Sequence, residues 1–205
     1  MVNQIKALEN SSTAIAIRKD LSDVSAPKFI IAEIIRQFGS HIDILVNNAG
    51  VERMGSIVDT LAEDFDFVYN VNVRAPLLML REVIPYLRSP GRIINIGSIG
   101  GRQGFPGMSV YCSSKTAMEG MTRCWAWELG REKHTVNAVN PGPVPSDMLQ
   151  SLPLEVIEKQ KANTPIENRV GTVDDIAQIV AWLASEESRW VTGQVIAASG
   201  GCAMY

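Results

Sequence analysis

The chain has 205 residues, of which 46% are hydrophobic and 20% are charged, as is ordinary for one globular domain. The formal net charge of −3 and the scattered Lys and Arg residues disfavour a nucleic acid or an anionic membrane as partner, because both attract clustered positive charge. No apolar run approaches the ~20 residues of a membrane span, and the N-terminus lacks a signal-peptide pattern. The three cysteines form no CxxC pair, which indicates free thiols and a cytoplasmic protein.

Strands and helices alternate through the first half of the chain. Residues 14–17 form a short apolar run that predicts a strand, and residues 25–38 place apolar side chains on one helical stripe that ends at Gly39. Residues 42–46 predict a compact buried strand. A helix is expected from residue 60 to about residue 87, with its prolines as bends or early-turn residues.

The second half continues the alternation. Three further strands are predicted, at residues 91–97, 135–139 and 194–198. Three further helices are predicted, at residues 109–129, 154–161 and 173–184, the last capped by Thr172 or its neighbour. Short buried strands that alternate with helices predict parallel βαβ units with right-handed crossovers. We therefore expect one α/β domain over residues 1–205, with a doubly wound parallel sheet.

Tyr111 and Lys115 stand four positions apart on the helix predicted at residues 109–129, so their side chains share one face. A free tyrosine has a pKa of ~10, and an adjacent ammonium group lowers it toward neutral pH, which makes the pair a plausible proton-transfer unit. Such pairs also occur by chance on helix surfaces. Ser98 adds weight, because it follows the strand at 91–97, at the sheet edge where ligands bind in open α/β sheets. A serine that only bonds turn backbone is the alternative.

Several motifs in order resemble the short-chain dehydrogenase/reductase family. They are Asn-Asn-Ala-Gly at 47–50 after a strand, Ser98 thirteen positions before Tyr111, Tyr-x-x-x-Lys at 111–115, and Asn-Pro-Gly-Pro-Val at 140–144. The tail up to Gly201 is also similar. The resemblance implies a Rossmann-like fold, a nicotinamide cofactor (NAD or NADP) and a small-molecule carbonyl or alcohol substrate.

The family's catalytic roles fall on four positions of this sequence. The resemblance implies that Tyr111 is the general acid or base, that Lys115 lowers its pKa and holds the nicotinamide ribose, and that Ser98 orients the substrate carbonyl. Asn72 matches the family's helix asparagine, which kinks its helix and completes a proton relay to solvent. No metal ligand set is indicated.

Further positions match the family's cofactor-binding residues. The resemblance implies that Asp20 meets the adenine ring and that Asn47, Ala49 and Gly50 lie along the adenine-side ribose. On the nicotinamide side, Val144 would meet the carboxamide, and Ser146 stands where the family usually has threonine. The helices that carry Asn72 and Tyr111 are expected to build a homodimer or homotetramer.

The sequence departs from the family at its start. The family begins with a strand, a TGxxxGxG turn, a helix and a second strand, whereas residues 1–8 resemble the end of the helix before the third strand. The fold is thus expected to be N-terminally truncated and to lack its first βαβ unit. Two missing strands would leave a gap of roughly 14 Å at ~4.8 Å per strand. We expect the strand at 14–17 to move beside that at 42–46, to pair with another chain, or to be disordered.

Three functions fit these observations. The first is an NAD(P)-dependent oxidoreductase that interconverts a ketone and a secondary alcohol. The second is a cofactor-independent isomerase, dehydratase or cyclase that uses the same tyrosine, since a fold does not fix a function. The third is a non-catalytic partner subunit of a full-length relative. A loop around 143–168 is rich in apolar residues and is expected to cover the site, which suggests an apolar substrate such as a polyketide-like or 3-oxoacyl group.

Overall fold

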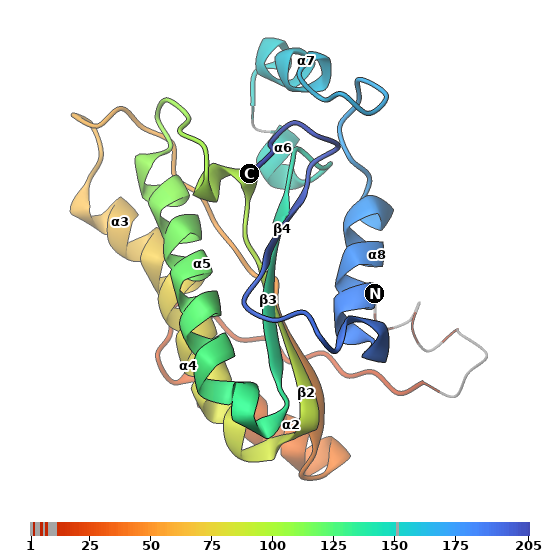
Figure 1. The fold of residues 1–205 in the computed structure, drawn as a ribbon. Helices are drawn as coiled ribbons and strands as arrows, with labels where there is room; N and C mark the ends of the chain where they lie inside the picture. The colour runs from red at the N-terminus through yellow and green to blue at the C-terminus, as the bar shows by residue number, and fades with distance from the viewer. Residues whose placement is uncertain (1, 3–4, 6, 8–11, 151) are drawn as a thin grey trace.

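The computed structural model describes residues 2, 5, 7, 12–150 and 152–205. Its centre is a parallel sheet whose strands lie in the order β1-β2-β3-β4 (Figure 1). The strands are β1 (Ile42–Asn47), β2 (Leu87–Ile96), β3 (Thr135–Pro141) and β4 (Val195–Ala198). The predicted doubly wound α/β class is confirmed. The helix end expected at residues 1–8 lies for the most part outside the described residues.

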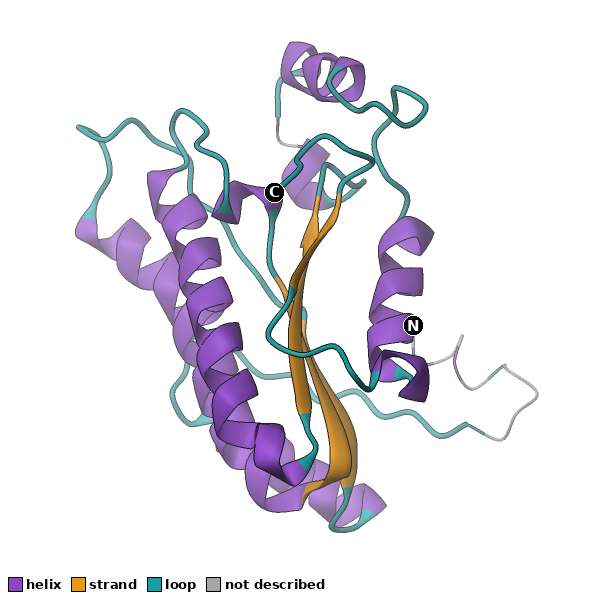
Figure 2. Ribbon diagram, viewed as in Figure 1, coloured by secondary structure: helices purple, strands orange, loops and turns teal. Residues whose placement is uncertain are grey.

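Helices cover both faces of this sheet, as Figure 2 shows. One face carries α2 (Ala26–Phe38), α3 (Ala62–Tyr69), α4 (Ala75–Val83) and α5 (Ser109–Leu129), and the other carries α8 (Val173–Ala184). The short helices α6 (Asp147–Gln150) and α7 (Leu154–Ala162) stand beyond the carboxyl ends of the strands. Single-turn helices occur at Ile84–Tyr86, Ile99–Gly101, Gly130–Glu132 and Glu186–Ser188.

The alternation of strand side chains builds two separate cores. On the α5 face, Ile93 and Val136 pack with Met118 and Trp125. On the α8 face, Ile94 of β2 and Val139 of β3 pack against Leu183. Successive strand residues point to opposite faces, so the continuous apolar runs of β2 and β3 fill both cores. These two cores hold the sheet rigid beneath the candidate site.

Two helices follow directly from local sequence signals. Helix α5 spans the residues predicted for it, and so does α8. At the start of α8, the Thr172 side chain accepts a hydrogen bond from the Asp175 amide at 3.1 Å, and the Asp175 carboxylate accepts one from the Thr172 amide at 2.7 Å. This capping box satisfies two amides that the first turn would otherwise leave without partners.

The helix predicted at residues 60–87 is interrupted at Asn72. Helix α3 passes into a π-helical turn at Asn70–Arg74 and then into α4, which has Pro76 in its first turn. A π-turn inserts one extra residue and redirects the helix. The bend that the sequence suggested is therefore present, and its centre is Asn72 rather than a proline.

Strand β1 forms an open edge, which corrects two expectations. Residues 14–17 form no strand and do not pair with β1. Among the described residues no strand pairs with the outer edge of β1, and β1 is only partly covered: Ile44 is 44% exposed and Val46 is 41% exposed. Leu45 points to the other face and packs into the α5-side core. The prediction of a compact buried strand at residues 42–46 was thus wrong, because burial of that face needs a further layer.

Candidate active site

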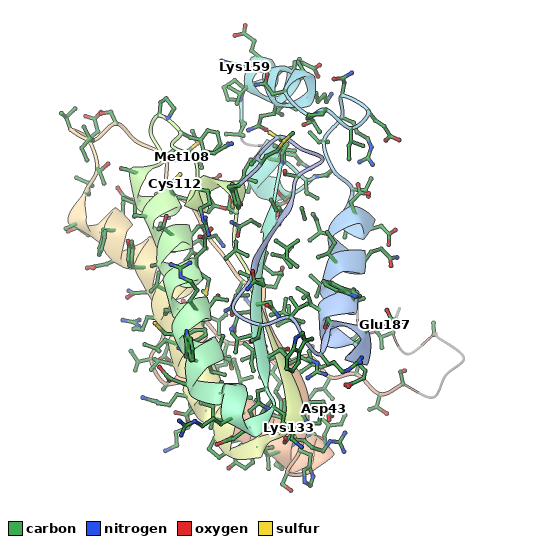
Figure 3. All side chains as sticks on the ribbon, viewed as in Figure 1. Asp43, Met108, Cys112, Lys133, Lys159 and Glu187 are labelled. Atoms are coloured by element: carbon green, nitrogen blue, oxygen red, sulfur yellow. The ribbon has the colours of Figure 1, made fainter. Side chains whose placement is uncertain are left out.

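The expected site residues gather at one edge of the sheet. The loops after β1, β2 and β3 leave the sheet at the carboxyl ends of these parallel strands, and α5 begins at the same level. In Figure 3, Met108 and Cys112 mark this beginning of α5, whereas Asp43 and Lys133 mark the opposite edge. The carboxyl edge is where open α/β sheets bind ligands.

Tyr111 and Ser98 face each other at this edge. Tyr111 lies in the first turn of α5 and is 8% exposed, and the Ser98 side chain is its neighbour: a Cβ atom at Gly100 would lie 3.3 Å from Ser98 Oγ and 3.5 Å from Tyr111 Cε1. Ser98 Oγ also accepts a hydrogen bond from the Gly100 amide at 3.0 Å, which fixes the serine at the start of the turn Ile99–Gly101. Because the amide occupies an acceptor position of Oγ, the serine O–H remains able to donate.

Burial sets the proton affinity of the phenol. It raises the pKa of Tyr111 above its ordinary value of 10.0, while the hydrogen bond from Ser98 lowers it. Lys115 was expected to lower this pKa, but desolvation of the phenol is the largest influence on it. The phenol is therefore protonated at neutral pH and is in the form of a proton donor.

Lys115 lies one turn further along α5 with its ammonium group inside the protein. The residue is 5% exposed, and Nζ donates a hydrogen bond to the carbonyl oxygen of Ile96 at 2.9 Å. Nζ lies 5.7 Å from the centre of the Tyr111 ring. Burial lowers the pKa of Lys115 to about 8, because the charged form loses hydration. The backbone carbonyl of Ile96, at the end of β2, thus holds the Lys115 ammonium group near the phenol.

Asn72 joins the π-turn to the loop after β1. Its Oδ1 accepts a hydrogen bond from the Val51 amide at 2.8 Å, and Nδ2 donates to the Val51 carbonyl at 2.8 Å. Nδ2 also donates to Ser114 Oγ at 3.0 Å on α5. The side chain is 1% exposed, so these bonds hold it in one orientation. Asn72 therefore clamps the loop that carries Gly50 against α5, a contact that the sequence analysis did not foresee.

Gly50 packs closely beside these two side chains. A Cβ atom at this position would lie 3.3 Å from Lys115 Nζ and 3.6 Å from Asn72 Oδ1. Residue 50 therefore has little room for a side chain beside the ammonium group. This ammonium group is a donor of the kind that the hydroxyl groups of a nicotinamide ribose require.

The described residues contain no glycine-rich turn of the kind that holds the pyrophosphate of a dinucleotide. Gly39 is the first glycine of the chain, and it ends helix α2 instead of beginning a helix. A pyrophosphate is normally held by such a turn and a helix N-terminus. Among the described residues, the donor set thus suits the ribose of a nicotinamide dinucleotide, and no glycine-rich turn is present for its pyrophosphate.

The remaining expected cofactor residues lie on separate loops. Asn47 Nδ2 donates to Asn95 Oδ1 at 2.8 Å, and Asn47 and Ala49 line a cavity of about 410 Å³ between β1, α2 and α4. Asp20 stands on another loop, where its Oδ1 accepts from the Ser22 amide at 2.9 Å. Its neighbour Leu21 lines the same cavity.

Two expected cofactor residues follow β3. Val144 Cγ2 would lie 3.4 Å from a Cβ atom at Gly171, and Ser146 Oγ accepts from the Leu149 amide at 3.2 Å. Both residues sit on the path that leads to α6. The structure thus brings Ser98, Tyr111, Lys115 and Asn72 together with Gly50, and leaves Val144 and Ser146 on a loop with local contacts.

A cluster of three polar side chains behind Ser98 was not expected from the sequence. It consists of Asn140 at the end of β3, Glu119 on α5 and Tyr205 near the C-terminus, joined by hydrogen bonds of 2.7 Å. One signal was available, because Glu119 stands four positions after Lys115 and so places a charge on the helix face that carries Tyr111.

No group of three or more His, Cys, Asp or Glu side chains is arranged to hold a metal ion in the part of the chain that the structure describes. None of the helices in that part is both long and apolar enough to cross a membrane.

Comparisons with known proteins place the chain in a family. Residues 2–203 match the family model described as enoyl-(acyl carrier protein) reductase. Dehydrogenase OXI1 of Cochliobolus heterostrophus is 43% identical over 98% of this chain and 89% of its own length. Hydroxynaphthalene reductase arp2 of Aspergillus fumigatus is 38% identical over 88% of this chain and 70% of its own length.

A solved structure agrees with these matches. The crystal structure of a blue fluorescent protein from a metagenomic library, in complex with NADPH, superposes with a TM-score of 0.92 at 35% identity. The match covers 99% of this chain and 81% of that protein. The chain belongs to the short-chain dehydrogenase/reductase family of oxidoreductases, as the motif pattern indicated.

Proposed function

We propose that this protein interconverts a ketone and a secondary alcohol with a nicotinamide dinucleotide, and that Ser98, Tyr111, Lys115 and Asn72 form its active site. One observation carries the proposal: a buried phenol lies beside a serine hydroxyl, with a buried ammonium group one helical turn away. Buried titratable groups at a ligand-binding edge are costly to fold and are typical of catalytic sites.

Three side chains contribute to the transfer of one proton. Tyr111 donates its phenolic proton to the substrate oxygen in reduction and accepts it in oxidation. Ser98 donates a hydrogen bond to the same oxygen as negative charge develops on it. The Lys115 ammonium stabilises the phenolate that remains. The chemistry that the dinucleotide supplies when bound is transfer of a hydride to or from the carbonyl carbon.

The substrate is proposed to be an apolar ketone, such as a polyketide-like or 3-oxoacyl compound. The segment 143–168 stands over the carboxyl edge and exposes apolar side chains: Leu154 is 71% exposed and Ile166 is 58% exposed. Such a segment can close over an apolar ligand. One relative is named as a hydroxynaphthalene reductase, and a bicyclic aromatic ketone is therefore the first compound to test.

The test measures reduction of a bicyclic aromatic ketone with NADPH and NADH in parallel, for the unchanged chain and for Tyr111→Phe. Loss of the proton donor is expected to lower kcat by about 100- to 10,000-fold. Tyr86→Phe is the matched control, because Tyr86 lies at the opposite end of β2 and is expected to leave kcat unchanged.

Two outcomes would contradict the proposal. Equal turnover by Tyr111→Phe would exclude the phenol as the proton donor. Turnover of a carbonyl compound that persists after exhaustive removal of nucleotide, yet disappears in Tyr111→Phe, would instead identify a cofactor-independent proton-transfer enzyme on this fold.

We further propose that two copies associate through the helices that carry Asn72 and Tyr111, in a reducing cytoplasmic compartment. Trp127 on α5 is 88% exposed and Leu77 on α4 is 46% exposed, and large apolar side chains at a surface are typical of contact with another chain. The cysteines in the described residues are free thiols. Light scattering of the purified chain would measure the mass, and a monomer at micromolar concentration would contradict the association.

A further inference from the structure

The side chain of Asn140 forms a buried junction, because its hydrogen bonds connect α5, the C-terminal segment and the loop after β2. Its side chain is 0% exposed, and both hydrogens of Nδ2 are donated, to Glu119 Oε1 on α5 and to Tyr205 Oη, each at 2.7 Å. Oδ1 accepts a hydrogen bond from the Ser98 amide at 3.1 Å. Since one donor or acceptor faces each segment, the amide group has a single orientation that satisfies all three.

The neighbours of Asn140 leave it no freedom to shift. A Cβ atom at Gly97 would lie 2.0 Å from Asn140 Oδ1. The backbone of the loop that follows β2 and carries Ser98, called the catalytic loop below, therefore packs directly on the Asn140 amide. Glu119 is 2% exposed, and its Oε2 forms an ion pair with Arg102 of the same loop. A buried carboxylate keeps its charge only when such partners surround it. The loop is therefore fixed to β3 and α5 from behind.

The C-terminal segment reaches the same junction. Gly200 and Gly201 adopt φ angles of +61° and +86°, which turn the chain back after β4. Ser199 Oγ closes the turn with two hydrogen bonds of 3.1 Å to the backbone of Ala203. Figure 1 shows the C-terminus beside the loop that follows β2.

Tyr205 ends this segment over Arg102. The centre of its ring lies 4.9 Å from the guanidinium carbon of Arg102, within the range of a cation–π contact. Its hydroxyl group is the acceptor that Asn140 Nδ2 requires, and burial raises the pKa of Tyr205, so that the group stays neutral. Although half exposed, Tyr205 thus contacts both the loop and the amide that holds Ser98.

We propose that Tyr205, acting through Asn140, is a positioning residue for Ser98. The Tyr205 hydroxyl holds the Asn140 amide, the Asn140 amide holds the Ser98 backbone, and the Ser98 hydroxyl then meets Tyr111. Side-chain networks of this kind fix geometry more strongly than their single bonds suggest. The inference rests on the proposed function only in its kinetic consequence.

The test uses Tyr205→Phe, which removes the hydroxyl group and keeps the ring over Arg102. The matched control is Tyr69→Phe, because the Tyr69 hydroxyl donates to Ser113, outside this junction. The first measurement is hydrogen exchange at the Ser98 amide. Loss of one hydrogen bond is expected to reduce its protection by roughly 3- to 10-fold in Tyr205→Phe and not in the control.

The second measurement is the titration of Tyr111, followed by NMR of ring-labelled tyrosine. The bond from Ser98 lowers the pKa of Tyr111, so a displaced Ser98 is expected to move this titration to higher pH. The other titratable groups that act on the phenol are Lys115, Cys112 and Glu52, and the substitution changes none of them. A purely structural role for Tyr205 would leave this titration in place.

The third measurement is turnover of the bicyclic ketone. We expect kcat to fall by roughly 3- to 10-fold with KM within about twofold, because Ser98 acts on charge that develops during the reaction. Unchanged Ser98 exchange and an unchanged Tyr111 titration in Tyr205→Phe would overturn the inference, whatever the turnover. Absence of turnover in the unchanged chain, with both shifts present, would overturn the proposed function alone.

A second variant tests the same inference independently of how well Tyr205→Phe folds. A chain that ends at Met204 loses both the hydroxyl group and the ring, and it is expected to lower Ser98 protection further than Tyr205→Phe does. Equal protection of the Ser98 amide in this shortened chain and in the full chain would also overturn the inference.

Discussion

Lys115 is expected to reduce the stability of the fold that it serves. The residue is 5% exposed, and burial lowers its pKa from the ordinary 10.5 to about 8. A shift of this size corresponds to roughly 3 kcal/mol of unfavourable free energy when the group is charged. Lys115→Met removes the charge and keeps an unbranched side chain, at a cost of about 1 kcal/mol for the hydrogen bond to Ile96. We therefore expect Lys115→Met to raise the free energy of unfolding by about 2 kcal/mol at neutral pH.

The pH dependence of this difference identifies its cause. Because the pKa is lower in the folded state than in the unfolded state, the folded chain binds fewer protons between pH 8 and 10.5. The unfavourable contribution of Lys115 is complete below about pH 8 and disappears as the pH rises to 10.5. The advantage of Lys115→Met should therefore shrink across this interval.

Urea unfolding of both chains at several pH values between 7 and 10.5 measures the difference directly. Lys28→Met is the control, because it removes the same charge from the exposed side of α2. The two chains share all other titrating groups, including the buried Tyr111, so the difference isolates Lys115. A Lys115→Met chain that is less stable at pH 7, or a difference that does not vary with pH, would refute the assigned cost of burial.

Two further substitutions test the packing of the site and of the open edge. Gly97→Ala places a Cβ atom 2.0 Å from Asn140 Oδ1 and is expected to destabilise the chain by about 1–3 kcal/mol in urea unfolding, whereas Gly104→Ala, with no atom within 4 Å, should not. Equal stability of the two variants would show that the catalytic loop does not pack on Asn140. Ile44→Lys adds a charge to a side chain that is 44% exposed, and it is expected to weaken binding of a hydrophobic dye with less than about 0.5 kcal/mol change in stability. A large loss of stability would show that Ile44 is buried in solution.

Local signals in the sequence were sufficient for most of the elements. Helices were predicted at the residues where α5 and α8 occur, with Thr172 or its neighbour as the cap of α8. These signals act within one or two helical turns, so they need no knowledge of the rest of the fold. The spacing of Tyr111 and Lys115 was sufficient to place both side chains on one helix face for the same reason.

Long-range packing decided what the sequence could not. Tyr205 contacts Asn140 across 65 positions, and no periodic pattern links residues so far apart. Strand β1 has the apolar sequence of a buried strand, yet its Ile44 side chain is 44% exposed, because β1 is the edge strand of the described sheet. The pKa of Tyr111 rises instead of falling, because desolvation by burial outweighs the lowering effect of Ser98.

By itself, then, the sequence determined most of the helices and strands and which family motifs they carry. Only the tertiary structure decided which of these groups are buried, which polar atoms have hydrogen-bond partners, and that Tyr205 stands behind Ser98. The physical reason is the range of the interactions involved. Periodicity, capping and spacing act between neighbours in the chain, whereas burial and hydrogen bonding between Asn140, Glu119 and Tyr205 exist only once distant segments have packed together.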